Sequence, residues 1–186
     1  MPRTSIAAVL AATLITSSAG TPSAEEIDPG GTLNPDEMSL SRSLSRAREG
    51  EVGMVVCSQG YLMTKRGDHE AARTLFEACA EAGYTGTMTW MSYMDTNGFG
   101  APEDPEEAAA WDRRAAEAGD PVGAYNYGLD LLRGYGVPED EAAGREWIDR
   151  AADAGLAPAV SLREGNYDPA LATPDADDWR YRQRYY

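Results

Sequence analysis

An internal repeat is the feature that most constrains what this chain can fold into. Residues 98–119 and 134–155 align without gaps at a spacing of 36, and 11 of the 22 aligned positions are identical. The identical positions include Gly98 and Gly134, Pro102 and Pro138, Asp104 and Asp140, and Trp111 and Trp147. A weaker copy places Ala72, Leu75, Ala80 and Gly83 at the same spacing before Ala108, Trp111, Ala116 and Gly119. Such self-similarity is typical of solenoids, so the chain is predicted to contain three stacked units.

Each unit is predicted to consist of two helices. The second helix begins at Asp104 or Asp140, whose carboxylate can accept hydrogen bonds from free backbone amides, and it ends at Gly119 or Gly155. The first helix is expected over 87–96 and 122–132. A pair of this size cannot bury its apolar face alone, so neighbouring pairs must stack. The sequence therefore predicts an all-α fold.

The residues of the repeat also resemble a known family, the Sel-one-like repeats, which are related to tetratricopeptide repeats. The resemblance rests on Tyr127-Gly128, on residues 134–140 (GYGVPED), on Trp147, and on Arg150 to Gly155. The middle unit has Met91-Ser92 in place of Tyr127-Gly128, and the first unit is shorter and more like an ordinary tetratricopeptide repeat. The resemblance implies a short right-handed α-solenoid of antiparallel helix pairs, with about three repeats over 51–162, used as a protein-binding scaffold of the bacterial envelope.

Helical caps are expected on both sides of the repeats. Residues 25–50 contain a polar lead-in and then a helix-start signal, Asn34-Pro35-Asp36-Glu37, which predicts an N-terminal cap helix over 38–49. A short helix over 157–162 should cover the other end. Residues 163–186 are expected to be a largely disordered tail. Its last eight residues, Trp179 to Tyr186, hold three arginines and four aromatic residues, which could instead fold back on the acidic solenoid or contact a partner.

Residues 1–24 have the layout of a secretory signal peptide. Arg3 precedes the apolar run from Ile6 to Ile15, and small residues allow cleavage after either Ala19 or Ala24. That run is too short to span a bilayer comfortably, and no second apolar stretch of about 18 residues follows it. The protein is therefore expected to be exported, to be periplasmic or secreted, and not to be embedded in a membrane.

The two cysteines, Cys57 and Cys79, both lie in the first unit. In an oxidising compartment an even pair suggests a disulfide between its two helices, and two buried free thiols are the alternative. Some secreted members of the family that this chain resembles carry such disulfides, although the alignment places these cysteines about one position from that pattern.

A partner-binding stripe is predicted along the first helices, which line the concave face in such solenoids. Tyrosine suits a binding surface because it offers a large apolar area with a polar tip. Packing between units is an equally weighted role for these side chains. The expected stripe consists of Tyr61, Thr64, Thr89, Tyr93, Thr96, Tyr125, Leu129 and Leu132.

Charge and residue types argue against several other functions. The chain has 16 Lys and Arg residues against 31 Asp and Glu, a net charge of −15, which would repel the phosphates of nucleic acids. His69 is the only histidine, and it is expected to be a solvated side chain at a helix start; no metal site, cofactor or catalytic residue is predicted. The partner is expected to be another protein, with peptidoglycan also considered. A narrower form of the scaffold hypothesis is that the protein regulates a signalling partner, as some members of the wider repeat family do. The competing hypothesis is a cell-wall hydrolase with lactamase-like or peptidoglycan-directed activity, as described for some proteins that resemble this family.

Overall fold

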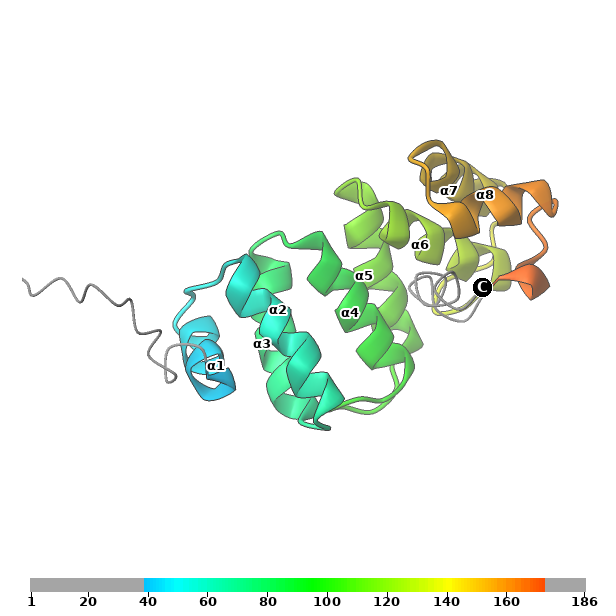
Figure 1. The fold of residues 1–186 in the computed structure, drawn as a ribbon. Coiled ribbons are helices and arrows are strands. Elements are labelled where there is room, and N and C mark those ends of the chain that lie inside the picture. Colours follow the sequence, from blue (N-terminus) through cyan, green and yellow to red (C-terminus); the bar gives the residue numbers. More distant parts are fainter. Residues whose placement is uncertain (1–38, 173–186) are drawn as a thin grey trace, which may run out of the picture. The chain divides into compact units, whose positions relative to one another are not determined.

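The computed structural model describes residues 39–172, and Figure 1 shows how they fold. This part of the chain is helical and contains no strand. Its elements are α1 (Leu40–Arg48), α2 (Met54–Lys65), α3 (His69–Glu81), α4 (Thr85–Thr96), α5 (Pro105–Glu117), α6 (Pro121–Arg133), α7 (Glu141–Asp153), α8 (Ala157–Glu164) and the 3-10 turn η1 (Pro169–Leu171). The prediction of an all-α fold is confirmed.

The repeated aspartates begin the helices as predicted. Asp104 caps α5 by accepting a hydrogen bond from the Glu107 amide at 3.1 Å, and Asp140 caps α7 in the same way through the Ala143 amide at 3.0 Å. Asp120 accepts from two amides at the start of α6. A proline follows the caps of α5 and α6, where its missing N–H costs no hydrogen bond. The residues at each N-terminus therefore determine where α5, α6 and α7 begin.

The helices pack as successive pairs, α2 with α3, α4 with α5, and α6 with α7. Each pair also packs against the next one, through α3 and α4 and then through α5 and α6. The first helices of the second and third units, expected over 87–96 and 122–132, are α4 and α6, each slightly longer than predicted. The arrangement is the α-solenoid that the repeat spacing indicates.

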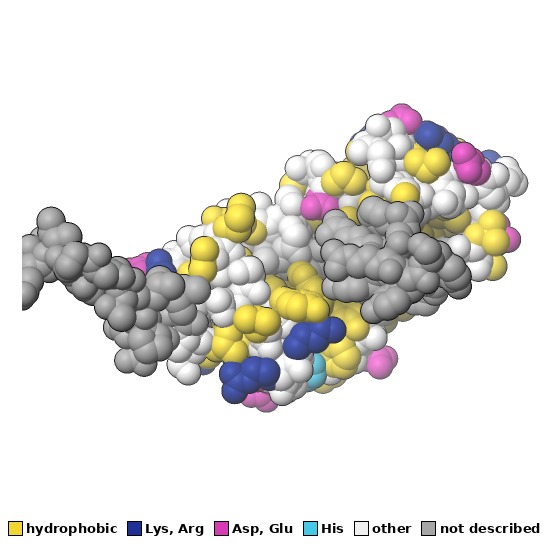
Figure 2. Space-filling model, viewed as in Figure 1, with side chains coloured by type: hydrophobic (Ala, Val, Ile, Leu, Met, Phe, Trp, Pro, Cys, Tyr) yellow, Lys and Arg dark blue, Asp and Glu magenta, His cyan; other side chains and the backbone are white. Residues whose placement is uncertain are grey.

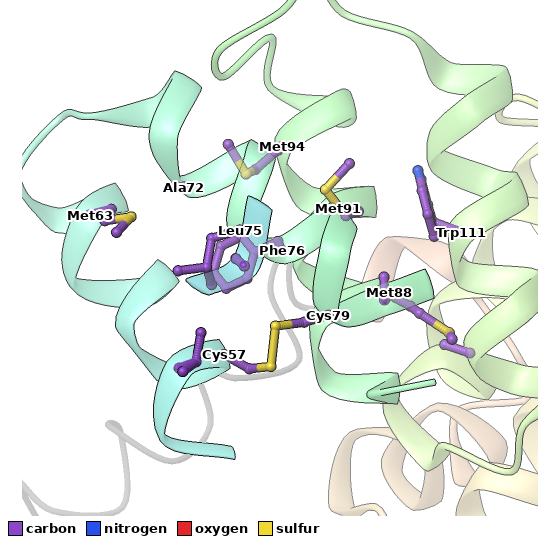
Figure 3. Packing of buried hydrophobic residues seen from close by; sticks show 14 residues of the cluster. Cys57, Met63, Ala72, Leu75, Phe76, Cys79, Met88, Met91, Met94 and Trp111 are labelled. Carbon is purple, nitrogen blue, oxygen red and sulfur yellow. A yellow bond between two sulfur atoms is a disulfide. The ribbon is translucent and has the colours of Figure 1, made fainter. Parts of the chain in front are cut away.

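Two hydrophobic clusters form the core, and they meet at α5. The first contains Phe76, Met91 and Trp111, with other side chains of α1 to α5 (Figure 3). The second is built around Tyr125 and Ile148 with other side chains of α5 to α8. Consecutive α5 residues divide between them, since Ala115 belongs to the first cluster and Ala116 to the second.

A disulfide joins Cys57 on α2 to Cys79 on α3, as Figure 3 shows. The Cα atoms are 5.9 Å apart, within the usual range for a bridge. The bridge directs the Cys57 side chain toward α3, and both cysteines are buried in the first cluster. The expected bridge is present, and the alternative of two free thiols is not what the structure contains.

The caps on the repeats differ in detail from the prediction. Ser39 caps α1, which begins at Leu40; the helix-start signal at 34–37 lies outside the described residues. The predicted helix over 157–162 is α8, and it continues to Glu164. The signal-peptide region, the lead-in and the segment Trp179 to Tyr186 also lie outside the described residues.

Residues 163–172, the first part of the segment that was expected to be loose, contact α6 and α7. The Tyr167 hydroxyl donates a hydrogen bond to Asp149 on α7 at 2.8 Å. The carbonyl of Pro169 in η1 accepts one from Arg133 at the end of α6, also at 2.8 Å. Asn166 and Tyr167 both adopt left-handed backbone conformations, which turn the chain after α8 back toward α6 and α7. Composition alone did not show this turn.

Candidate functional site

A continuous run of aromatic side chains crosses from α2 to α4 and on to the start of α3. We call Tyr61, Trp90, Tyr93, Phe99 and His69 the aromatic run. Neighbouring ring centroids are separated by 5.6 Å from Tyr61 to Trp90, 5.5 Å from Trp90 to Tyr93, 5.7 Å from Tyr93 to Phe99, and 4.6 Å from Phe99 to His69. The first three contacts are edge-to-face and the last is stacked, which are the geometries that aromatic pairs prefer.

Helix spacing and a glycine loop bring these rings together. Trp90 and Tyr93 are three residues apart on α4 and therefore share one side of the helix. Phe99 lies between Gly98 and Gly100, which both have positive φ angles. A β-carbon at Gly100 would lie 2.8 Å from the carbonyl oxygen of His69, so only glycine lets the loop approach α3 this closely. That approach accompanies the stacking of Phe99 on His69.

The aromatic run is partly open to solvent. Tyr93 is 39% exposed, and the neighbouring Leu62 on α2 is 48% exposed. The Lys65 ammonium lies 5.2 Å from the centre of the Tyr61 ring, a cation–π distance. Figure 2 shows hydrophobic side chains gathered on this side of the molecule, with the histidine and basic side chains among them. The surface therefore combines apolar area with positive charge on a strongly acidic chain.

The predicted stripe is only partly a surface. Tyr61 and Tyr93 belong to the aromatic run, and Thr96 is exposed on the same helix as Tyr93. Thr64 and Thr89 are half-buried, and their hydroxyls donate to the carbonyls of Gly60 and Gly86, each at 3.0 Å. Both threonine hydroxyls are therefore hydrogen-bonded to backbone carbonyls of their own helices in this structure.

The part of the stripe on α6 is buried, which corrects the prediction of one exposed tyrosine face. Tyr125 is 1% exposed and Leu129 is 6% exposed, and both belong to the second hydrophobic cluster. Leu132 is half-buried and packs against the same cluster. For these α6 positions the packing role, which was weighed equally with partner contact, is the one observed.

Sequence reasoning missed three members of the aromatic run. Trp90 and Phe99 were not singled out from the sequence, and His69 was expected to be solvated. The structure corrects the last expectation, because the His69 ring is half-buried against Phe99. The one available signal in the sequence was Phe99, an aromatic residue between two glycines. Its role could not be predicted, because it depends on which helix the loop contacts.

A buried polar network links α4, α5 and α6. Asp112 on α5 is 3% exposed and accepts hydrogen bonds from the Ser92 hydroxyl and from the Asn126 amide, the latter at 3.1 Å. Burial raises the pKa of Asp112 well above its usual value, and the nearby carboxylate of Asp130 raises it further. The two hydrogen bonds act in the opposite direction.

Asp130, one turn after Asn126 on α6, is a second acid in this region and is half-buried. Burial raises its pKa to about 7, while the charge of Arg133 acts to lower it. Its Oδ2 atom is buried and has no hydrogen-bond partner among the described residues. An acid held in this way is close to half-protonated at neutral pH, and a cationic group placed beside it would favour the charged form.

The described residues contain no group of three or more His, Cys, Asp or Glu side chains that could hold a metal ion. In the same part of the chain, no helix is long and apolar enough to cross a membrane.

Comparisons with known proteins follow the same repeat pattern. The Sel1 repeat family matches the chain three times, at residues 51–84, 87–120 and 121–156. These ranges correspond to the pairs α2–α3, α4–α5 and α6–α7. No sequence among curated proteins matches the chain.

Two solved structures are similar to this fold. A Sel1 repeat protein from Oxalobacter formigenes is 28% identical, with a TM-score of 0.55, and the match covers 70% of this chain and 98% of that one. Helicobacter pylori cysteine rich protein B is 18% identical, with a TM-score of 0.56, and the match covers 72% of this chain and 98% of that one. At this level of identity the second match supports a shared fold and nothing more. The three matched repeats span more than half of the sequence, and the chain therefore belongs to the Sel1 repeat family.

Proposed function

We propose that this protein is an exported scaffold of the bacterial envelope that binds a segment of another protein through the aromatic run. The observation that carries the proposal is the row of five ring side chains with Tyr93 39% exposed at its centre. Binding proteins through helical repeats is the general role of the Sel1 repeat family. The aromatic run gives that role a location in this chain.

The chemistry of the surface favours an apolar or aromatic peptide segment as the partner. Rings that are already fixed by one another lose little conformational entropy on binding, so more of the apolar contact energy remains as affinity. Tyr93 is flanked by Trp90 and Phe99 and is still 39% exposed, so part of this side chain is available to a partner. Such rigid aromatic positions are the type that dominate protein interfaces.

A photocrosslinking experiment tests the location of the surface. Tyr93 is replaced by p-benzoylphenylalanine in the native cells, and Tyr84 is replaced in the same way as a matched control. Tyr84 is 36% exposed, similar to Tyr93, but stands at the other end of α4. We expect irradiation to give a discrete adduct with a second protein from position 93 and at least a five-fold weaker one from position 84. Equal labelling at the two positions would contradict the proposal.

The disulfide supports export, because such bonds persist in oxidising compartments and are rare in the cytosol. Residues 1–24 are proposed to direct that export. Deleting them should keep the protein in the cytoplasm with two alkylatable thiols, whereas the full chain should be recovered outside the cytoplasm with none. N-terminal sequencing of the exported form would then decide between cleavage after Ala19 and after Ala24. Recovery of both forms in the cytoplasm would contradict the proposed export.

We further propose that the scaffold has no hydrolase activity, and that its protein partner is a signalling component rather than peptidoglycan. A Ser-His-Asp mechanism in this chain would have to use His69, whose ring is stacked against Phe99. Turnover of a β-lactam and of a peptidoglycan fragment by the purified protein should not exceed the rate with unfolded protein. Measurable turnover that is lost in His69→Ala would support the hydrolase instead.

A further inference from the structure

Two cations without acidic partners stand at one end of the aromatic run. Lys65 is the last residue of α2 and Arg66 follows it as the C-cap, and both side chains are exposed. The Lys65 ammonium lies 5.2 Å from the centre of the Tyr61 ring, which is the first ring of the run. Within residues 39–172, neither cation forms an ion pair. Their positive charge is therefore available beside an aromatic surface.

The lack of an acidic partner sets Lys65 and Arg66 apart from the cations of several other helices. Every arginine of α3, α5, α7 and α8 pairs with a carboxylate, for example Arg113 with Glu117. The chain has 31 acidic residues against 16 basic ones, so acids are plentiful. The described part of the chain nevertheless places none of them against Lys65 or Arg66, which leaves both cations free to pair with a carboxylate of another molecule.

Two exposed acids, Asp68 and Glu70, also belong to this end of the first helix pair. They lie at the N-cap and in the first turn of α3, where the helix dipole favours negative charge. They reduce the net charge of the surface around Lys65. An incoming carboxylate would therefore be bound by close contact with the ammonium, because a distant field from this surface would be weak.

Successive contacts join Lys65 to the exposed Tyr93. They measure 5.2 Å from the Lys65 ammonium to the Tyr61 ring, 5.6 Å from Tyr61 to Trp90, and 5.5 Å from Trp90 to Tyr93. The ammonium is therefore no farther from the Tyr93 ring than these three steps together. An extended segment of about five residues covers that distance at about 3.3 Å per residue. One short peptide segment can thus contact both the cation and the exposed ring.

We propose that the partner segment carries an Asp or Glu side chain that pairs with Lys65, within about five residues of the apolar or aromatic residue that contacts Tyr93. This inference rests on the proposed function, because it names the chemistry of the partner at the same surface. The ammonium is already held over the Tyr61 ring, so pairing costs little side-chain entropy. A side-chain carboxylate fits these exposed cations, whereas a chain terminus is typically captured by backbone N–H groups.

Photocrosslinking in the native cells tests the charge of the partner. With p-benzoylphenylalanine at position 93, Lys65→Gln and Arg66→Gln together should lower the adduct yield at least three-fold, the size expected for exposed ion pairs. Arg42→Gln and Arg48→Gln together are the matched control and should leave the yield unchanged. Both control arginines are exposed on α1 and form no ion pair with a described residue.

Mass spectrometry of the adduct should map the crosslink to a segment with Asp or Glu within about five residues of the crosslinked position. An unchanged yield in the Lys65 and Arg66 variant, or a mapped segment without a nearby acid, would overturn this inference. In either case the adduct itself would still support the proposed function.

Peptide binding to the purified full chain gives a readout that does not need the cellular partner. The probe is the peptide Ser-Trp-Phe-Ser-Gly-Ser-Glu-Ser, acetylated, amidated and carrying a neutral fluorescent label. It should bind at least three-fold more tightly than the same peptide with Gln in place of Glu, and this preference should decline as salt rises from about 50 to 300 mM. A third peptide, with Gln and a free C-terminal carboxylate, should bind no better than the Gln peptide.

Variants of the protein assign the preference to Lys65. Lys65→Gln should abolish the preference for the Glu peptide, Lys65→Arg should retain it, and Asp68→Asn should increase it. Equal affinity for the Glu and Gln peptides, undetectable binding of both, or a preference for the free C-terminus would overturn the inference. Tyr93→Ala should weaken all of the peptides alike and so reports on the proposed surface, which means that the two proposals can fail separately.

Discussion

Single residues in this protein show how one repeat contact can be made in two chemical ways. Ser92 and Asp112 lie 36 residues before Gly128 and Ile148. In the α6–α7 pair a β-carbon at Gly128 would lie 2.8 Å from the Ile148 side chain, so glycine makes room for the isoleucine. In the α4–α5 pair the same positions hold a hydroxyl donating to a buried carboxylate. The polar version costs desolvation, which is seen in the raised pKa of Asp112.

The half-buried acid Asp130 gives a prediction about pH. Its folded pKa of about 7 lies above the unfolded value near 3.8, so the folded state binds more protons between those pH values. The free energy of unfolding therefore falls as the pH rises through that window, by about 2–3 kcal/mol between pH 5 and pH 8. Asp130→Asn should reduce the loss by that amount in urea denaturation at the two pH values. The variant's gain in stability over the natural protein should grow from pH 5 to pH 8, and an equal difference at both pH values would contradict the assignment.

The repeated glycine loops give a second prediction at the residue scale. Gly136 has a φ of +66°, and a β-carbon there would lie 1.9 Å from the carbonyl oxygen of Pro105 at the start of α5. Gly119 has a φ of +88° with nothing within 4 Å of such a β-carbon. Gly119→Ala should therefore cost only backbone strain, about 1 kcal/mol, and Gly136→Ala about 3 kcal/mol or more because the backbones must separate. Urea midpoints measure both, and equal losses would contradict this explanation.

At the scale of elements, the first pair is held differently from the other two. Neither α2 nor α3 has a side-chain cap of the kind that Asp104 and Asp140 provide for α5 and α7. The disulfide between α2 and α3 instead closes a loop with a sequence separation of 22. A cross-link of this kind restricts the unfolded chain and so favours the folded pair.

Removing this disulfide should destabilise the protein by about 3 kcal/mol, from the loop-closure relation for a loop of this size. The comparison is urea unfolding of the oxidised and reduced protein, followed by mass spectrometry to count alkylated thiols. A Cys57→Ala, Cys79→Ala variant serves as the control, because its stability should not respond to reductant. A natural protein whose unfolding midpoint is unchanged by complete reduction would show that the bridge adds no stability.

For the described unit as a whole, the two clusters that meet at α5 suggest that stability is distributed along the stack. Repeats contact mainly their neighbours, so a loss at one end is felt most strongly near that end. The last helix, α8, covers the second cluster with Leu162, which is 2% exposed. The first cluster is closed by α1 and contains the disulfide.

Leu162→Ala should therefore destabilise the C-terminal helices more than the N-terminal ones. The truncation leaves a cavity in the second cluster and should cost about 2–4 kcal/mol. Native-state hydrogen exchange is expected to show this loss in the amides of α7 and α8 and little change in α2 and α3. The corresponding change in the first cluster, Leu75→Ala, should give the opposite distribution. A uniform loss of protection over all helices in both variants would show a single cooperative unit instead.

The sequence by itself determined the repeat architecture. A spacing of 36 between matching glycines, prolines and aspartates predicts the helix pairs, because caps and turns depend on residues close together in the chain. Asp104 and Asp140 accordingly begin α5 and α7 as expected. The sequence left both a bridge and two free thiols open for Cys57 and Cys79, and the structure contains the bridge.

Tertiary structure alone decided which of the repeated side chains form a surface. Tyr93 and Leu129 occupy equivalent positions 36 residues apart, yet Tyr93 is 39% exposed and Leu129 is 6% exposed. Periodicity fixes the side of a helix on which a residue lies, but exposure depends on what the neighbouring units place there. Phe99 and His69 came together only because a glycine loop reaches the preceding unit. The candidate site is thus a product of packing between repeats, which no single repeat encodes.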